Sequence, residues 1–222
     1  MKIDFPYPGY ERIAPIVVPD ANLLGVYAPR SVEQVNEDEA LARGFAEPHG
    51  APRLREAVRP TMRVLILVDD STRGTPVPRL LKRVIGNLWA AGVSDKQIRL
   101  LTAQGTHRRM TEGELRQKLG EFYGRFETHQ HDWLDESNLH EFGRTSDGTR
   151  MTANRLLREA DFVIGLGSIV PHRVKGFSGG AKIAFPGAQP VGGVPSHVGD
   201  GDGRGRQPNA PQDGRGGANR RA

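Results

Sequence analysis

Four short apolar runs, each followed by a polar loop, constrain the fold of this chain more than any other feature. The runs cover residues 63–68, 98–103, 126–128 and 161–166, and the first of them reads RVLILV. Continuous apolar runs of this kind are typical of strands that are buried on both faces. Helical periodicity lies between them, at residues 77–91, 111–119 and 151–159, and the second of these segments opens with the capping-box pattern TEGE. The alternation predicts a Rossmann-like α/β fold, with a mostly parallel sheet and helices on both faces.

The two ends of the chain differ from this alternating region. Residues 31–45 are polar with a helical pattern, and we predict a helix that begins near Ser31 with Glu33 in its first turn. From residue 188 onward Gly, Pro, Arg, Asp and Asn dominate, with almost no periodic apolar residues. Such a segment cannot bury enough apolar surface to fold. We therefore predict a folded domain over residues 1–187 and a disordered tail over residues 188–222.

Composition narrows the classes of function. The chain has no cysteine, which excludes disulfides and thiolate metal sites. No run of about 18 apolar residues occurs, and the N-terminus lacks a basic start before an apolar stretch. We therefore expect a cytoplasmic protein with no membrane partner. The net charge of +5 is not gathered into a basic stripe with interleaved aromatic residues, so we expect no nucleic-acid partner.

The loop after the first predicted strand carries the sequence DDSTRGTP, residues 69–76. Loops that follow parallel strands open at one edge of the sheet, and ligands of such folds bind there. Hydroxyls and backbone amides at a helix N-terminus suit a phosphate, and Arg73 suits a phosphate or a carboxylate. The alternative is that Asp69 to Thr72 only cap the following helix.

Imidazoles follow the second and third predicted strands. His107 lies after a glycine in the sequence QGTHRR. His129 and His131 alternate in an extended stretch, so at most one of them faces the edge of the sheet. Because His131 precedes Asp132, we favour His131 for that position.

The loop after the last predicted strand is the most informative. It contains His172 and then the sequence SGGAK, which ends in Lys182. Glycines let backbone amides approach a phosphate closely, although the spacing is not that of a P-loop. Polar and ionisable residues therefore follow all four strands, and this favours an active site at that edge.

These loops resemble the lactate racemase family in four places: DDSTRGTP, the AxGTHRRMT element, the HxHD element and SIVPHRVKGFSGGAKIAFPG. The resemblance runs from about residue 50 to residue 187. It implies an isomerase that racemises or epimerises a lactate-like 2-hydroxy acid. It also implies a nickel-pincer nucleotide, in which a pyridinium-3,5-bisthiocarboxylate mononucleotide holds nickel and is attached to Lys182. The implied partners are a small-molecule 2-hydroxy acid and cofactor-biosynthesis enzymes.

The resemblance also assigns roles to individual residues. The catalytic acid/base pair falls on His107 and His172. In the implied reaction one imidazole takes the hydroxyl proton while the α-hydrogen leaves as hydride to the cofactor, and the planar 2-oxo acid then receives the hydride on its other face. Arg73 also meets the anionic substrate. The turn that holds the cofactor falls on Asp70, Ser71, Thr72 and Arg73.

Beyond Gly187 the sequence departs from the family. A family member continues with a helix that supplies a histidine ligand to nickel and then with a second domain, and neither is found in residues 188–222. His197 lies near the ligand position, but its neighbours VPSHVGDGDG do not match. We therefore assign no metal ligand and hypothesise a truncated chain whose tail is read out of frame. We predict little or no turnover from this chain alone, because a cleft without one wall admits water.

Two other functions stay open at this point. One is a catalytically silent remnant of the same family that binds a nucleotide or phosphate with residues 70–73 and the glycine loop. The other is a metallohydrolase that uses His107, His131 and His172. The sequence leaves the particular 2-hydroxy acid undetermined.

Overall fold

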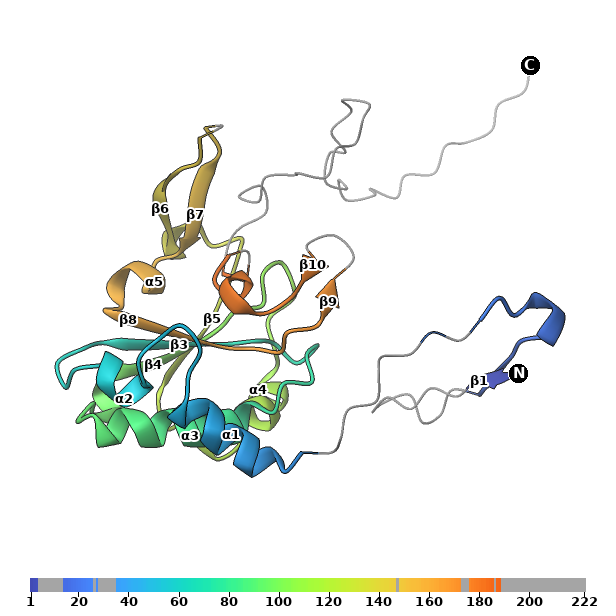
Figure 1. Cartoon of the computed structure of the whole chain (residues 1–222). Coiled ribbons are helices and arrows are strands. Elements are labelled where there is room, and N and C mark those ends of the chain that lie inside the picture. The colour runs from blue at the N-terminus through green and yellow to red at the C-terminus, as the bar shows by residue number, and fades with distance from the viewer. Residues whose placement is uncertain are drawn as a thin grey trace, which may run out of the picture. The chain divides into compact units, whose positions relative to one another are not determined.

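A computed structural model of the 222-residue chain gives the fold. It describes residues 1–3, 14–25, 27, 35–146, 148–172, 176–185 and 187–188. The chain divides into two compact units, and the division falls after Pro48. The second unit contains the central sheet and every residue that the sequence assigns to a site (Figure 1).

The first unit is small. Strands β1 (Lys2–Ile3) and β2 (Ile16–Val17) form an antiparallel pair, followed by the short helix η1 (Asp20–Asn22) and by α1 (Glu37–Ala46). The side-chain oxygen of Asn36 accepts hydrogen bonds from the amides of Asp38 and Glu39, which caps α1 at its start. The helix therefore begins at Glu37, and the predicted start at Ser31 lies outside the described residues.

A four-stranded parallel sheet with the order β5–β4–β3–β8 organises the second unit. This confirms the α/β fold and the mostly parallel sheet expected from the sequence. All five residues of β3 are buried, as the RVLILV run predicts. The strands are β3 (Val64–Val68), β4 (Ile98–Thr102), β5 (Glu127–Gln130) and β8 (Phe162–Leu166).

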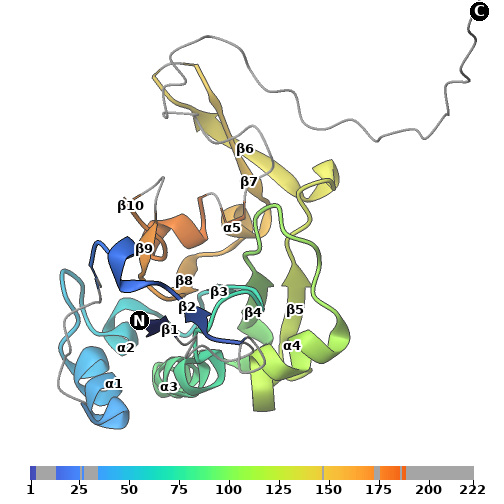
Figure 2. The ribbon, with the colours of Figure 1, turned by 90° about the vertical axis from the view of Figure 1, so that its right-hand side faces the viewer.

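Helices cover both faces of this sheet (Figures 1 and 2). On one face lie α3 (Val77–Ala90) and α4 (Glu112–Leu119), and α3 buries an apolar stripe that includes Leu81, Ile85 and Leu88. Thr111 and Glu114 form the predicted capping box at the start of α4. In the part of the chain that the structure describes, no helix has the length and apolar character needed to span a membrane.

The opposite face is covered by α5 (Leu156–Glu159) and by the end of the described chain. Leu65, Leu67 and Leu101 project to this face and pack with Leu156 and Ala188. Ala188 is fully buried, and its carbonyl accepts a hydrogen bond of 2.8 Å from the Asn154 amide. The folded part thus includes Ala188. Residues 189–222 lie outside the described residues, so their disorder stays a prediction.

The predicted helix over residues 151–159 is wrong in its first half. Strand β7 (Arg150–Asn154) pairs with β6 (Leu139–Arg144) in an antiparallel hairpin that projects from the sheet in both views (Figures 1 and 2). Only α5 is helical in this segment. The pairing with β6 determines the conformation of β7, and the local sequence pattern of a segment carries no information about a partner strand.

Several short elements complete the second unit. They are α2 (Leu54–Ala57), η2 (Asp95–Gln97), η3 (Gly120–Phe122), η4 (Glu136–Asn138), β9 (Pro171–His172), β10 (Gly176–Phe177) and η5 (Gly180–Ile183). Strands β9 and β10 pair antiparallel on the loop that leaves β8. Ile183 of η5 packs onto Gly165 of β8, where a Cβ atom would lie 2.6 Å from Ile183 Cγ2. Residue 165 must therefore be small for η5 to rest on the sheet.

We predict that Gly165→Ala lowers the free energy of unfolding by about 1–3 kcal/mol, because the new methyl group overpacks the contact with Ile183. Urea denaturation measures this change. Gly86→Ala is the matched control, because a Cβ at this exposed position in α3 meets nothing within 4 Å. It should raise the free energy by about 0.5–1 kcal/mol. Wild-type stability in Gly165→Ala would contradict the packing of η5 on β8.

Candidate functional site

The strands of the sheet end level with one another at their carboxyl ends. Val68 of β3 lies opposite Thr102 of β4 and Leu166 of β8, and Thr102 lies opposite Gln130 of β5. The loops that follow these strands therefore begin side by side, as the parallel arrangement predicts. They hold all the residues that the sequence assigns to a site.

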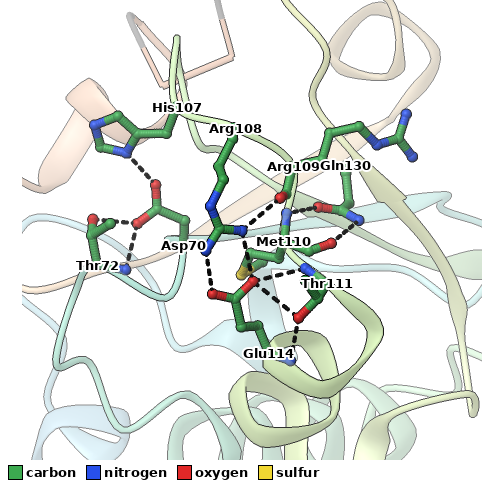
Figure 3. Close-up of polar contacts among 9 residues, drawn as sticks. All are labelled: Asp70, Thr72, His107, Arg108, Arg109, Met110, Thr111, Glu114 and Gln130. Atoms are coloured by element: carbon green, nitrogen blue, oxygen red, sulfur yellow. Dashed lines mark hydrogen bonds and ion pairs between the residues drawn. The ribbon is translucent and has the colours of Figure 1, made fainter.

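Asp70, at the end of β3, is the centre of a cluster of polar contacts (Figure 3). Its side chain is 6% exposed, and Oδ2 lies 2.5 Å from Nδ1 of the His107 ring. The other oxygen, Oδ1, accepts hydrogen bonds from the Thr72 amide at 2.9 Å and from the Thr72 hydroxyl at 2.5 Å. The His107 side chain is about half exposed, at 49%. A buried carboxylate thus holds an imidazole that solvent can reach.

The charge of Asp70 fixes how His107 is protonated. Burial raises the pKa of Asp70, but the hydrogen bonds from Thr72 and His107 outweigh it, and the pKa lies below its ordinary value. The carboxylate is therefore ionised at neutral pH and can only accept hydrogen bonds. Nδ1 of His107 must then carry a proton, and in the neutral form of the ring the lone pair is therefore on Nε2. Figure 3 shows the second ring nitrogen turned away from Asp70.

An ion pair fixes the loop that carries His107. The Arg108 guanidinium donates to both carboxylate oxygens of Glu114, at 2.6 and 2.8 Å. Glu114 also accepts from the Thr111 amide at 2.8 Å, so the same carboxylate closes the capping box of α4. Arg108 and the Thr111 amide hold the pKa of Glu114 at about 2. The histidine loop is therefore anchored to the start of α4 (Figure 3).

Backbone contacts fix the same loop on its other sides. The Gln130 side chain accepts from the Met110 amide at 2.7 Å and donates to the Met110 carbonyl at 3.0 Å. Gly105 adopts a φ of +57° and donates from its amide to the Gly187 carbonyl at 2.7 Å. His107 thus lies on a segment that β5 and the end of the lysine loop both hold.

The loop after β8 brings His172 and Lys182 to this edge. Both side chains are half-buried, His172 in β9 and Lys182 in η5. Gly179 has a φ of +73°, and a Cβ atom there would lie 2.7 Å from the Ser168 carbonyl oxygen. Only glycine fits this position, so the turn that precedes Lys182 needs the sequence GG. At Gly180 a Cβ atom would meet nothing within 4 Å, so space adjoins this turn.

The predicted site residues fall into two groups. Direct side-chain contacts join Asp70 with Thr72 and His107. Ser71 and Arg73 are exposed on the same turn, and the Arg73 amide donates to the Asp70 carbonyl at 3.1 Å. His172 and Lys182 lie on the loop that leaves β8. That loop is joined to the turn by the hydroxyls of Thr75 and Ser168, which lie 2.7 Å apart.

The sequence missed a buried ion pair beneath the turn. Asp69 lies 2.6 Å from Nζ of Lys118, which is on α4. Asp69 was considered only as a helix cap. A signal did exist, because Lys118 shares the helical face of Leu115 and Leu119. A lysine on an apolar face needs a buried partner.

His131 lies in the protein interior. Its side chain is fully buried, with Nδ1 3.4 Å from the Asn154 side-chain nitrogen. Its backbone amide donates to the Thr102 carbonyl at 3.1 Å. Among the described residues, no group of three or more His, Asp or Glu side chains could hold a metal ion. The alternative of a metallohydrolase built on three histidines therefore has no support.

Comparison with known proteins identifies relatives. The sequence model of a family described as the lactate racemase N-terminal domain matches residues 10–192. The chain is 31% identical over 195 residues to a lactate racemase of Lactiplantibacillus plantarum, which covers 84% of this chain and 44% of the relative. It is 28% identical over 194 residues to a lactate racemase of Thermoanaerobacterium thermosaccharolyticum, covering 86% and 45%. The chain thus spans less than half the length of these relatives.

Solved structures give the same result. The lactate racemase apoprotein from Thermoanaerobacterium thermosaccharolyticum superposes with a TM-score of 0.72 at 27% identity, covering 86% of this chain and 44% of that one. A protein from Thermotoga maritima superposes with a TM-score of 0.52 at 28% identity, covering 69% and 38%.

We predict that His107→Ala raises the pKa of Asp70, because the variant loses a hydrogen bond that favours the carboxylate while burial still disfavours it. NMR titration of the Asp70 carboxyl carbon measures the change. Thr72→Ala should act in the same direction, and Thr72→Ser, which keeps the hydroxyl, is its control. An unchanged pKa of Asp70 in His107→Ala would contradict the contact between Asp70 and His107.

Proposed function

Because the chain belongs to the lactate racemase N-terminal domain family, we propose that it is the cofactor-holding and proton-transferring part of a 2-hydroxy-acid racemase or epimerase. One observation carries the proposal: His107 rests on a buried, ionised Asp70 at the sheet edge that also carries Lys182. Racemase turnover is itself part of the proposal, since the chain spans less than half the length of its relatives.

His107 acts as a base through Nε2. Asp70 accepts from Nδ1, so the lone pair of Nε2 faces away from the carboxylate and can take the hydroxyl proton of a 2-hydroxy acid. The imidazolium that forms is stabilised by the carboxylate at 2.5 Å. When the proton returns to the substrate oxygen, the same pair is restored.

His172 serves as the second acid/base group. The two enantiomers of a 2-hydroxy acid present their hydroxyls in different directions from the α-carbon, so one imidazole cannot reach both without moving. His172 lies on β9 of the neighbouring loop and is half-buried. Each direction of the reaction then uses one histidine to remove the hydroxyl proton and the other to return it.

The residues at the edge fit a nickel-pincer nucleotide. One of its thiocarboxyl groups would be held by the Lys182 amine as a thioamide, and the glycine turn before Lys182 has open space at Gly180. Ser71 is exposed on the turn before α3, where its hydroxyl would suit the phosphate of the group, and the Thr72 amide and hydroxyl both donate to Asp70. The chain has no cysteine, and this group brings its own sulfur ligands. When bound, the group supplies the acceptor and then the donor for the hydride of the substrate α-carbon.

Arg73 binds the substrate carboxylate. Its side chain is exposed on the turn that also carries Asp70, so its guanidinium is available to an anion from solvent. A guanidinium meets a carboxylate through two parallel hydrogen bonds and so fixes the orientation of the acid. The α-carbon is thereby placed between the bound carboxylate and the histidines.

We predict that the chain, co-expressed with enzymes that make the cofactor, gains a covalent adduct on Lys182. Intact-mass measurement and nickel analysis detect it. Lys182→Ala should abolish both signals, and Lys82→Ala, which removes an exposed lysine of α3, is the matched control. An adduct that persists in Lys182→Ala, or no adduct in the wild type, contradicts the proposed attachment.

Racemisation of lactate by the loaded chain separates the two functions left by the sequence. If the chain turns over, we predict that His107→Ala and His172→Ala each slow both directions by about 100-fold or more, since each direction uses both imidazoles. Chiral chromatography of the acid measures both rates. An adduct without racemisation, even when the C-terminal part of a full-length relative is supplied in trans, identifies the catalytically silent binding part instead, and a loss in only one direction contradicts the two-histidine assignment.

A further inference from the structure

Two consecutive carboxylates leave β3 and meet different partners. Asp70 meets His107, whereas Asp69 meets Lys118, which lies far along the chain on α4. The side chains of Asp69 and Lys118 are only 12% and 7% exposed, and Oδ1 lies 2.6 Å from Nζ. Among the described residues, Oδ1 accepts no hydrogen bond of standard geometry. The ammonium group thus meets this oxygen as a charge.

Stability alone does not account for this pair. Two charges lose their hydration when they are buried, and an apolar pair of similar size often stabilises a fold at least as well. Lys118 lies next to Leu119, which is fully buried, so an apolar side chain at position 118 would continue that core. The two charges are therefore better explained by the groups that they hold in place.

The pair holds both ends of the turn that follows β3. At one end, Nζ of Lys118 donates to the Arg73 carbonyl at 3.0 Å. At the other end, the Thr75 hydroxyl donates to Oδ2 of Asp69. Because that hydroxyl proton is used, Ser168 must be the donor in the 2.7 Å contact between the two hydroxyls. One buried carboxylate thus connects α4, the turn and the loop that leads to Lys182.

We propose that Asp69 and Lys118 are positioning residues that hold residues 70–73 in the conformation that binds an anion. This rests on the proposed function of the turn. Lys118 draws the Arg73 carbonyl inward, and that carbonyl would otherwise repel a phosphate. The exposed side chains of Ser71 and Arg73 would then meet the anion, whereas the Thr72 amide and hydroxyl stay bonded to Asp70. Neither Asp69 nor Lys118 touches the ligand, because both are buried beneath the turn.

The test compares binding with stability in two variants. The probe is nicotinate mononucleotide, with affinity measured by calorimetry and stability by urea denaturation. Lys118→Met leaves Asp69 buried without its cation, so both stability and affinity should fall. The double variant Asp69→Asn with Lys118→Met removes both charges of the pair and should recover stability. Its affinity should stay lower than that of the wild type by about tenfold, because the turn has lost its hold on the Arg73 carbonyl.

Each outcome decides the proposal. A double variant that is stable and binds like the wild type makes the pair purely structural and overturns the positioning role. If the double variant does not fold, Asp69→Asn alone decides, because it keeps the size of the side chain and an acceptor for Thr75. Weaker binding by the folded Asp69→Asn chain supports the role, and unchanged binding overturns it. Lys82→Met is the control and should change neither quantity.

The same experiment separates this inference from the function on which it rests. A wild-type chain that does not bind the mononucleotide overturns both the anion-binding turn and the role of Asp69 and Lys118. A wild-type chain that binds, with variants that bind equally well, overturns only the positioning role.

Discussion

The parallel pairing of β3 with both β4 and β8 is the constraint on which the candidate site depends. Val68 is level with Thr102 on one side and with Leu166 on the other, so three loops leave the sheet together. A shift of one residue in either pairing would turn the side chains of that strand to the opposite face. All five residues of β3 are buried, so the side chains on both faces of this central strand are packed against neighbouring elements.

Two consecutive aspartates at the end of β3 have different partners. Asp69 faces the helices and meets Lys118, whereas Asp70 faces the loop edge and meets His107. Both carboxyls are buried, and each has a partner suited to its place. The ammonium of Lys118 is buried beneath the turn, whereas solvent reaches the imidazole of His107. The candidate site thus has a buried ion pair beneath an accessible imidazole.

The sequence predicted the parts of the fold that depend on local pattern. The conformations of the RVLILV run, of the amphipathic segment after it and of the TEGE capping box follow from their own local sequences. The structure confirms each of them. The β6–β7 hairpin was missed because its conformation depends on a partner strand rather than on its own periodicity. Ala188 was assigned to the tail for a similar reason, since its burial comes from contacts with distant residues.

The sequence predicted the residues of the candidate site only in part. His107, Asp70 and Thr72 stand in loops whose residue types suggest chemistry, and the structure brings these three together. The contact between Asp70 and His107 could not be predicted, because nothing in the sequence DDSTRGTP shows which of its two aspartates contacts the histidine. Lys118 was missed because a charged residue on a helix is usually solvated, and only the fold buries it.

The proposed function requires the carboxyl edge of the sheet to bind a pyridine mononucleotide beside His107 and Lys182. The most direct measurement is an NMR titration of the ¹⁵N-labelled chain with nicotinate mononucleotide, which maps each amide whose resonance shifts. The account predicts saturable shifts for the turn of residues 70–73, for His107 and for the loop around Lys182. Shifts confined to other surfaces, or none at all, would contradict it.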